Sequence, residues 1–208
     1  MSILTPAVDR FAAVVIAAAV FAVAPFTAVA ATAGAAAPEF KLTDTAGRTV
    51  QLADFRGKFV VLEWTNPECP FVNKHYTSGN MQGLQKEWGA KDVVWLSINS
   101  TNAGHPEYKT PAEMAAWMRD KGAAQKATLL DGTSATGKAY GARTTPQMAV
   151  VDPSGRLIYT GAIDDRRSAN PADVKGANNY VRAALTEALA GKPVTTPATT
   201  PYGCSVKY

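Results

Sequence analysis

One strand, turn and helix segment constrains the fold of this chain more than any other. Residues 58–64 are almost continuously apolar over the length of one strand, which predicts a strand buried on both faces of a sheet. A short polar turn follows, then Cys69 and Pro70. Because proline suits the first turn of a helix, we expect a helix over residues 70–88, interrupted near residues 78–80. The turn that carries Cys69 therefore joins a buried strand to a helix.

The remaining patterns predict further strands and helices in alternation, then a hairpin and a last helix. Residues 92–99 form a second buried strand, and a proline and a glycine delimit a helix at residues 111–121. The other expected elements are a hairpin at 40–44 and 49–52, a strand at 128–130, a short helix at 134–140, a hairpin at 148–152 and 157–163, and a helix at 180–189. This order predicts an α/β fold with a mixed central sheet, helices on both faces and an N-terminal β-hairpin.

The two ends of the chain differ in composition from the middle. Residues 1–30 contain a short apolar run and end on a small-x-small pattern, which predicts a signal peptide and a periplasmic or extracellular protein. An acidic residue before the apolar run leaves an uncleaved membrane anchor as the alternative. We expect a small-residue linker at 31–37, one domain at 38–191, and an irregular tail at 192–208 that carries Cys204.

Charge and cysteine content narrow the functional class. The formal net charge is +4 without a dense cluster of basic residues, which favours a solvated surface over nucleic-acid binding. Two cysteines in an exported protein can form a lasting disulfide, but they are too few to replace a hydrophobic core. We expect no cofactor and no resident metal.

Three motifs together resemble one known superfamily. They are the lead-in at residues 37–40 and 57–64, the helix start Cys-Pro-Phe-Val at 69–72, and Arg-Thr-Thr-Pro at 143–146. The chain resembles the thioredoxin-like superfamily, specifically its redoxin branch of exported thiol-disulfide oxidoreductases and peroxiredoxin relatives. The resemblance covers about residues 37–191, and it implies a thioredoxin-like three-layer fold with a cis-proline at Pro146.

Two positions depart from the patterns of these relatives. Thioredoxins carry a second cysteine three residues after the first, where this chain has Val72. Peroxiredoxins carry a threonine three residues before the peroxidatic cysteine, where this chain has Asn66. The near redox partner is thus missing, and the peroxidase motif is incomplete.

Cys69 is the expected nucleophile. With Pro70 at the first helical position, Cys69 becomes the N-cap residue, and its sulfur is expected to accept backbone N–H groups at the positive end of the helix dipole. Glu68 would oppose ionisation if its carboxylate turned inward. Two basic residues on the same helix point away from the cysteine: Lys74 and His75. The alternative is an unreactive, buried cysteine that acts as a small hydrophobic residue. Because we expect the polar turn at residues 66–68 to be exposed, we favour a reactive thiol.

The proline loop supplies the expected substrate contacts. A cis bond before Pro146 exposes backbone groups of Thr145 that suit an extended substrate, whereas a purely structural tight turn is the alternative. We place four residues in the substrate-binding set: Thr145, Pro146, Pro70 and Asn66. The acidic and basic residues at 164–167 are expected to form a solvated loop, with a position near the active face as the alternative.

Cys204 has three interpretations. It resolves the intermediate formed on Cys69, it forms a permanent structural disulfide, or it stays unpaired or pairs between chains. A Cys69–Cys204 bond would close a loop of well over 100 residues, and it could stabilise the fold by about 5 kcal/mol in the chain-entropy treatment.

The leading hypothesis is an exported thiol-disulfide oxidoreductase with Cys69 as nucleophile and Cys204 as resolving cysteine. Its partners would be protein or small-molecule disulfides and a reductant protein. A thiol peroxidase that reduces hydroperoxides on the same cysteine is the first alternative. Two non-enzymatic alternatives are a redox-silent peptide-binding module and a copper chaperone, which would draw its ligands from Cys69, His75, Met81, His105 and Cys204.

Overall fold

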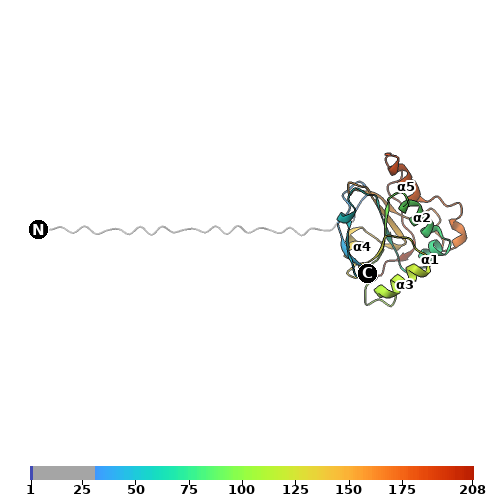
Figure 1. Ribbon diagram of the computed structural model, residues 1–208, viewed down its shortest axis with the longest axis horizontal. Helices are drawn as coiled ribbons and strands as arrows, with labels where there is room; N and C mark the ends of the chain where they lie inside the picture. Colours follow the sequence, from blue (N-terminus) through green and yellow to red (C-terminus); the bar gives the residue numbers. More distant parts are fainter. Residues whose placement is uncertain (2–30) are drawn as a thin grey trace.

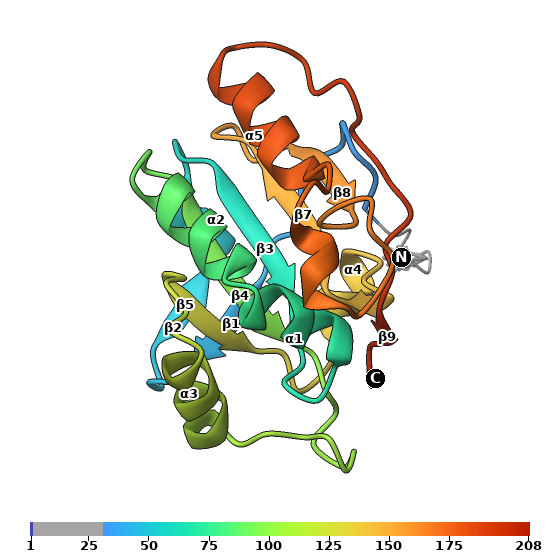
Figure 2. The same cartoon turned by 90° about the vertical axis from the view of Figure 1, so that its right-hand side faces the viewer.

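The computed structural model describes Met1 and residues 31–208, so the predicted signal peptide lies, apart from Met1, outside the described residues. The described chain folds around a seven-stranded sheet of order β2-β1-β5-β4-β3-β7-β8, and a second, two-stranded sheet joins β6 to β9. Figure 1 labels the helices, and Figure 2 labels most of the strands. The strands are β1 (Lys41–Asp44), β2 (Thr49–Gln51), β3 (Val60–Trp64), β4 (Val94–Asn99), β5 (Ala127–Leu130), β6 (Thr144–Thr145), β7 (Gln147–Val151), β8 (Leu157–Gly161) and β9 (Cys204–Ser205). The helices are α1 (Pro70–Thr77), α2 (Asn80–Gly89), α3 (Pro111–Asp120), α4 (Ala135–Ala139) and α5 (Tyr180–Leu189), with 3-10 helices η1 (Leu52–Phe55) and η2 (Pro171–Val174).

Strand β3 lies inside the sheet, and all five of its residues are buried. It runs parallel to β4 on one side and antiparallel to β7 on the other. A strand with neighbours on both sides and helices or loops on both faces needs apolar residues along its whole length. The continuous apolar pattern therefore predicted this strand correctly.

Both faces of the sheet are covered, as predicted. Helices α1, α2, α3 and α5 pack on one face, where Met81 and Leu185 belong to the buried cluster, and Figure 2 shows α1, α2 and α5 in front of the strands. The other face is covered by the N-terminal segment, η1 and the end of α4, through Phe40, Leu52 and Tyr140. The result is the mixed three-layer arrangement with an N-terminal hairpin, β1 with β2.

The predicted interruption of the first long helix is confirmed. Helix α1 ends at Thr77 and α2 begins at Asn80, with Gly79 between them at a φ of +75°. A left-handed residue cannot continue a right-handed helix, and glycine adopts this conformation without the Cβ clash. None of the helices in the described part of the chain is long and apolar enough to cross a membrane.

The tail is more regular than predicted. Residues Cys204 and Ser205 form strand β9, which pairs antiparallel with β6, and Ala198 bridges to Thr160 of β8. The small-residue segment at 31–37 also bonds to the domain, because the N–H of Ala37 donates to the carbonyl of Gly155 at 2.9 Å. Local composition missed these pairings, since each one depends on a partner distant in sequence.

We expect Leu62→Ala to lower the free energy of unfolding by about 2–5 kcal/mol, because it removes a fully buried side chain from the central strand. Leu189→Ala is the matched control, since Leu189 is 41% exposed at the end of α5, and its effect should stay within about 0.5 kcal/mol. Urea unfolding monitored by tryptophan fluorescence measures both. Equal losses in the two variants would contradict the central position of β3.

Candidate functional site

Cys69 is the N-cap residue of α1, as predicted, and its side chain is almost fully buried. Pro70 follows at the first helical position, and the carbonyl of Cys69 accepts the N–H of Asn73 at 2.9 Å. The predicted capping by the sulfur is wrong: no backbone N–H of the helix bonds to the Cys69 side chain. Its Sγ instead donates to the carbonyl oxygen of Thr145 at 2.9 Å. The thiol thus points at the proline loop.

The peptide bond between Thr145 and Pro146 is cis, as the resemblance implied. Thr145 is buried, and it is the last residue of β6. Its carbonyl oxygen is turned to Cys69, so the loop and the first turn of α1 meet at this hydrogen bond.

Cys204 lies beside the same proline loop. In the β6–β9 pair Cys204 stands opposite Thr145, whose carbonyl accepts the Cys69 thiol. Burial, then a hydrogen bond with Cys69, then the charge of Cys69 raise the pKa of the Cys204 thiol. Both cysteines are free thiols in this structure. The fold therefore brings the two cysteines of the chain to the same residue of the proline loop, Thr145.

The turn before Cys69 is less exposed than predicted. Asn66 is buried, its Oδ1 accepts the N–H of Glu68 at 2.9 Å, and its Nδ2 donates to Glu107 at 2.6 Å. Asn66 thus shapes the turn with both ends of its amide. Glu68 is exposed and turns outward to Lys109 at 2.5 Å, away from the thiol. Of the residues placed in the substrate-binding set, Pro70 is the exposed one.

Lys74 and His75 belong to a separate polar cluster, which we call the Lys74 cluster: Lys74, His75, Asp164 and Tyr202. All four residues are buried, and Lys74 Nζ lies 3.9 Å from Asp164 and 3.4 Å from the Tyr202 hydroxyl. The Tyr202 hydroxyl donates to Asp164 and lies 3.4 Å from His75 Nε2. The two basic residues point away from Cys69, as predicted, and they contact the tail that carries Cys204.

Sequence reasoning did not predict that Asp164 and Tyr202 meet in a buried polar cluster. The prediction of a solvated loop at residues 164–167 is wrong for Asp164, which is 1% exposed. The position of Tyr202 two residues before Cys204 was the one available signal that it fixes the tail.

Burial sets the protonation state in the Lys74 cluster. Burial first, and then the charge of Lys74, lower the pKa of His75 to about 3. His75 is therefore neutral near pH 7, with Nδ1 at 2.9 Å from the Asn80 amide. Burial also lowers the pKa of Lys74, although the Asp164 carboxylate opposes this shift.

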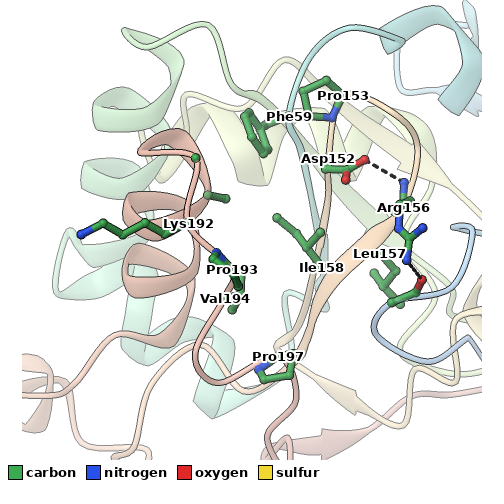
Figure 3. Close-up of a pocket in the computed structure, with 13 residues that line it drawn as sticks. Phe59, Asp152, Pro153, Arg156, Leu157, Ile158, Lys192, Pro193, Val194 and Pro197 are labelled. Carbon is green, nitrogen blue, oxygen red and sulfur yellow. Dashed lines mark hydrogen bonds between the residues drawn. The ribbon is translucent and has the colours of Figure 1, made fainter.

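The described residues around the cysteines form no metal-binding cluster, and the cavity shown in Figure 3 lies elsewhere. Within residues 31–208, no group of three or more His, Cys, Asp or Glu side chains gathers in a way that could hold a metal ion. A cavity of about 450 Å³ lies between β8 and the segment after α5, lined by Phe59, Pro153, Ile158 and Val194 among others (Figure 3). Its lining includes neither cysteine.

A seven-stranded mixed sheet, a cysteine at the start of the helix after β3, and a cis-proline facing that cysteine define a thioredoxin-like domain. The chain belongs to the Redoxin family, whose profile matches residues 32–181. The matched region contains Cys69 and ends before Cys204.

Known proteins support this assignment. The chain is 30% identical over 139 residues to the thiol-disulfide oxidoreductase ResA of Geobacillus thermodenitrificans, a match that covers 62% of this chain and 70% of ResA. Among solved structures it is similar to an uncharacterized conserved protein from Geobacillus kaustophilus, with 30% identity, a TM-score of 0.75, and 85% and 92% of the two chains covered. A hypothetical protein from Sinorhizobium meliloti matches with 27% identity, a TM-score of 0.74, and 86% and 96% covered.

We expect stability to fall with acid partly through His75. Its pKa in the folded protein, about 3, lies below that of an unfolded histidine, so between about pH 6.5 and 3 the unfolded state binds a proton that the folded state does not. His75 should therefore contribute a loss of up to about 1.4 kcal/mol in unfolding free energy for each pH unit in that window.

Urea unfolding at several pH values between 7.5 and 5 measures this loss. His75→Gln has no group that titrates at this position, so its unfolding free energy should change less steeply with pH than that of the wild type. Identical slopes in the two proteins would show that His75 does not contribute.

Proposed function

We propose that this protein is an exported thiol-disulfide oxidoreductase in which Cys69 is the nucleophile and Cys204 is the resolving cysteine. One observation carries the proposal: Cys69 bonds to the Thr145 carbonyl, and Cys204 pairs with Thr145 in the adjacent strand. Membership of the Redoxin family and similarity to a thiol-disulfide oxidoreductase support the same chemistry. Export rests on the signal-like sequence at residues 1–30.

The reaction has two exchange steps. The Cys69 thiolate attacks one sulfur of a substrate disulfide, a mixed disulfide forms, and the other substrate sulfur leaves as a thiolate. Cys204 then loses its proton and attacks Sγ of Cys69, which releases the second substrate thiol and leaves a Cys69–Cys204 disulfide. Two electrons pass from the protein to the substrate, and a reductant protein returns the pair to thiols.

The assignment of roles follows from the surroundings of the two thiols. Burial and Cys69 raise the pKa of Cys204, so Cys204 keeps its proton near neutral pH and does not compete with Cys69 for the first attack. Cys69 lies at the N-terminus of α1, where the helix dipole stabilises a developing negative charge. Thr145 is the residue that both cysteines share, through a hydrogen bond to Cys69 and a strand pairing with Cys204.

Disulfide mapping tests the couple. We expect the wild type, treated with a disulfide oxidant and then alkylated, to yield a linked pair of peptides containing Cys69 and Cys204 that disappears on reduction. Cys204→Ser should accumulate the mixed disulfide at Cys69, because the second step is blocked, whereas Cys69→Ser should not react. Two free thiols after oxidation of the wild type would refute the proposal.

Substrate comparison separates disulfide exchange from the peroxidase alternative. We expect the reduced wild type to be oxidised faster by a disulfide than by the same concentration of hydrogen peroxide, since Asn66 replaces the threonine of the peroxidase motif and bonds within the protein. Rapid alkylation followed by mass spectrometry gives both second-order rate constants. A faster reaction with peroxide would favour the peroxidase.

A further inference from the structure

The C-terminal strap, residues 197–206, occupies the edge of the proline loop. It runs from the segment after α5 along β8 to β9 (Figure 2). Near its start, the carbonyl of Pro197 and the N–H of Thr199 each bond to Thr160 of β8 at 3.1 Å. At its end β9 pairs with β6, and the N–H of Val206 donates to the carbonyl of Arg143 at 3.0 Å. Strand β6 is therefore already paired, with a segment of the same chain.

Contacts before and after β9 hold the strap in place. Upstream, Tyr202 belongs to the Lys74 cluster, where its hydroxyl donates to Asp164. Its ring packs edge-on against Phe71, with the ring centroids 5.9 Å apart. Downstream, the carbonyl of Lys207 accepts the N–H of Asn102 at 2.7 Å, and the Tyr208 hydroxyl donates to the carbonyl of Ala142 at 2.5 Å. Anchors on both sides of Cys204 make the strap part of the folded domain.

Gly203 allows the strap to lie this close to the loop. A Cβ at Gly203 would lie 2.1 Å from the carbonyl oxygen of Thr145 and 2.7 Å from its carbonyl carbon. Both atoms belong to the backbone of the cis-proline loop, so neither can rotate away. The φ of Gly203, +141°, is a second reason why a residue with a side chain is strained there.

We propose that the strap fills the position in which an extended polypeptide would pair with β6, and that it thereby selects low-molecular-weight disulfides as substrates of Cys69. This inference rests on the proposed function. An exposed strand edge binds an extended peptide through backbone hydrogen bonds, and here β9 already makes those bonds. A protein disulfide must displace β9 and the Tyr202 anchor. A small disulfide needs no strand pairing with β6, so it can approach at Cys204, which is half-buried, while β9 stays in place.

The two exchange steps balance when the substrate is one small disulfide, RSSR. The Cys69 thiolate attacks one sulfur, so that Cys69–S–S–R forms and RS⁻ leaves. Cys204 attacks Sγ of Cys69, the Cys69–Cys204 bond forms, and the second RS⁻ leaves. The protein dithiol loses two electrons, and the two protons of the protein thiols end on two RSH molecules.

Gly203→Ala in the full chain is the direct test, because its Cβ must push the strap off Thr145. Gly176→Ala is the matched control: Gly176 also has a positive φ, +81°, but an added Cβ meets nothing within 4 Å. The rate constants for oxidation of reduced protein are measured with oxidised glutathione and with insulin, by rapid alkylation and mass spectrometry. Hydrogen exchange of the Val206 amide reports strap release independently of activity.

We expect the wild type and Gly176→Ala to prefer oxidised glutathione over insulin. Gly203→Ala should shift the ratio toward insulin by about tenfold or more, as expected when a closed state is destabilised by about 1.4 kcal/mol, and its Val206 amide should exchange faster. A wild type that prefers insulin, or a ratio that stays unchanged while Val206 exchange increases, would overturn the strap proposal and leave the Cys69–Cys204 couple intact. Cys69 that reacts with neither disulfide would refute the proposed function itself.

A milder variant covers the case in which Gly203→Ala does not fold. Tyr202→Phe keeps the ring on Phe71 and removes the hydroxyl that donates to Asp164. It should shift the same ratio in the same direction by a smaller factor. Tyr180→Phe is its control, since the Tyr180 hydroxyl makes no hydrogen bond within residues 31–208. Equal ratios in the two variants, with faster Val206 exchange in Tyr202→Phe, would contradict the strap.

Discussion

The backbone of Thr145 connects the parts of this molecule that matter for its chemistry. Its carbonyl oxygen accepts the thiol of Cys69, its strand pairs with Cys204, and its cis bond to Pro146 orients the loop. Gly203 lies so close to the same carbonyl that no side chain fits between them. A shift of this one peptide would alter the distance between the sulfurs, the path of the tail and the entrance to the site together. Its almost complete burial keeps it in place.

Two buried polar clusters maintain this geometry from different sides. Glu63, the fourth residue of β3, is fully buried, and it accepts hydrogen bonds from Tyr76 at 2.9 Å and from Trp95 at 2.9 Å. These bonds tie α1 and β4 to the central strand, while burial raises the pKa of the Glu63 carboxyl. The Lys74 cluster ties α1 to the tail. Because removal of one member of a buried charged group leaves its partner unsatisfied, both clusters fix specific neighbours.

How far the sequence predicted this structure depends on the range of each interaction. Burial of β3, the N-cap position of Cys69 and the break at Gly79 follow from adjacent residues, and a pattern within a few positions reveals them. The contacts of Asn66 with Glu107 and of Asp164 with Tyr202 join residues far apart in the chain. Local composition describes such residues as polar loop, because the burial that changes their role comes from elements supplied elsewhere.

The absence of a cysteine at position 72 has a physical consequence for the reverse reaction. Val72 is completely buried within the apolar cluster on the α1 face, and in the mechanism we propose the redox partner comes from the strap instead. In the proposed couple, oxidation links the strap covalently to Cys69 and keeps it closed over the loop. A reductant thiolate then has two sulfurs to attack. Cys204 is the more exposed of the two, and its raised pKa makes it the poorer leaving group. Attack at Cys204 is favoured on both grounds. It expels Cys69 as a thiolate and leaves Cys204 in a mixed disulfide with the reductant, and a second thiol of the reductant then releases Cys204 for the next cycle.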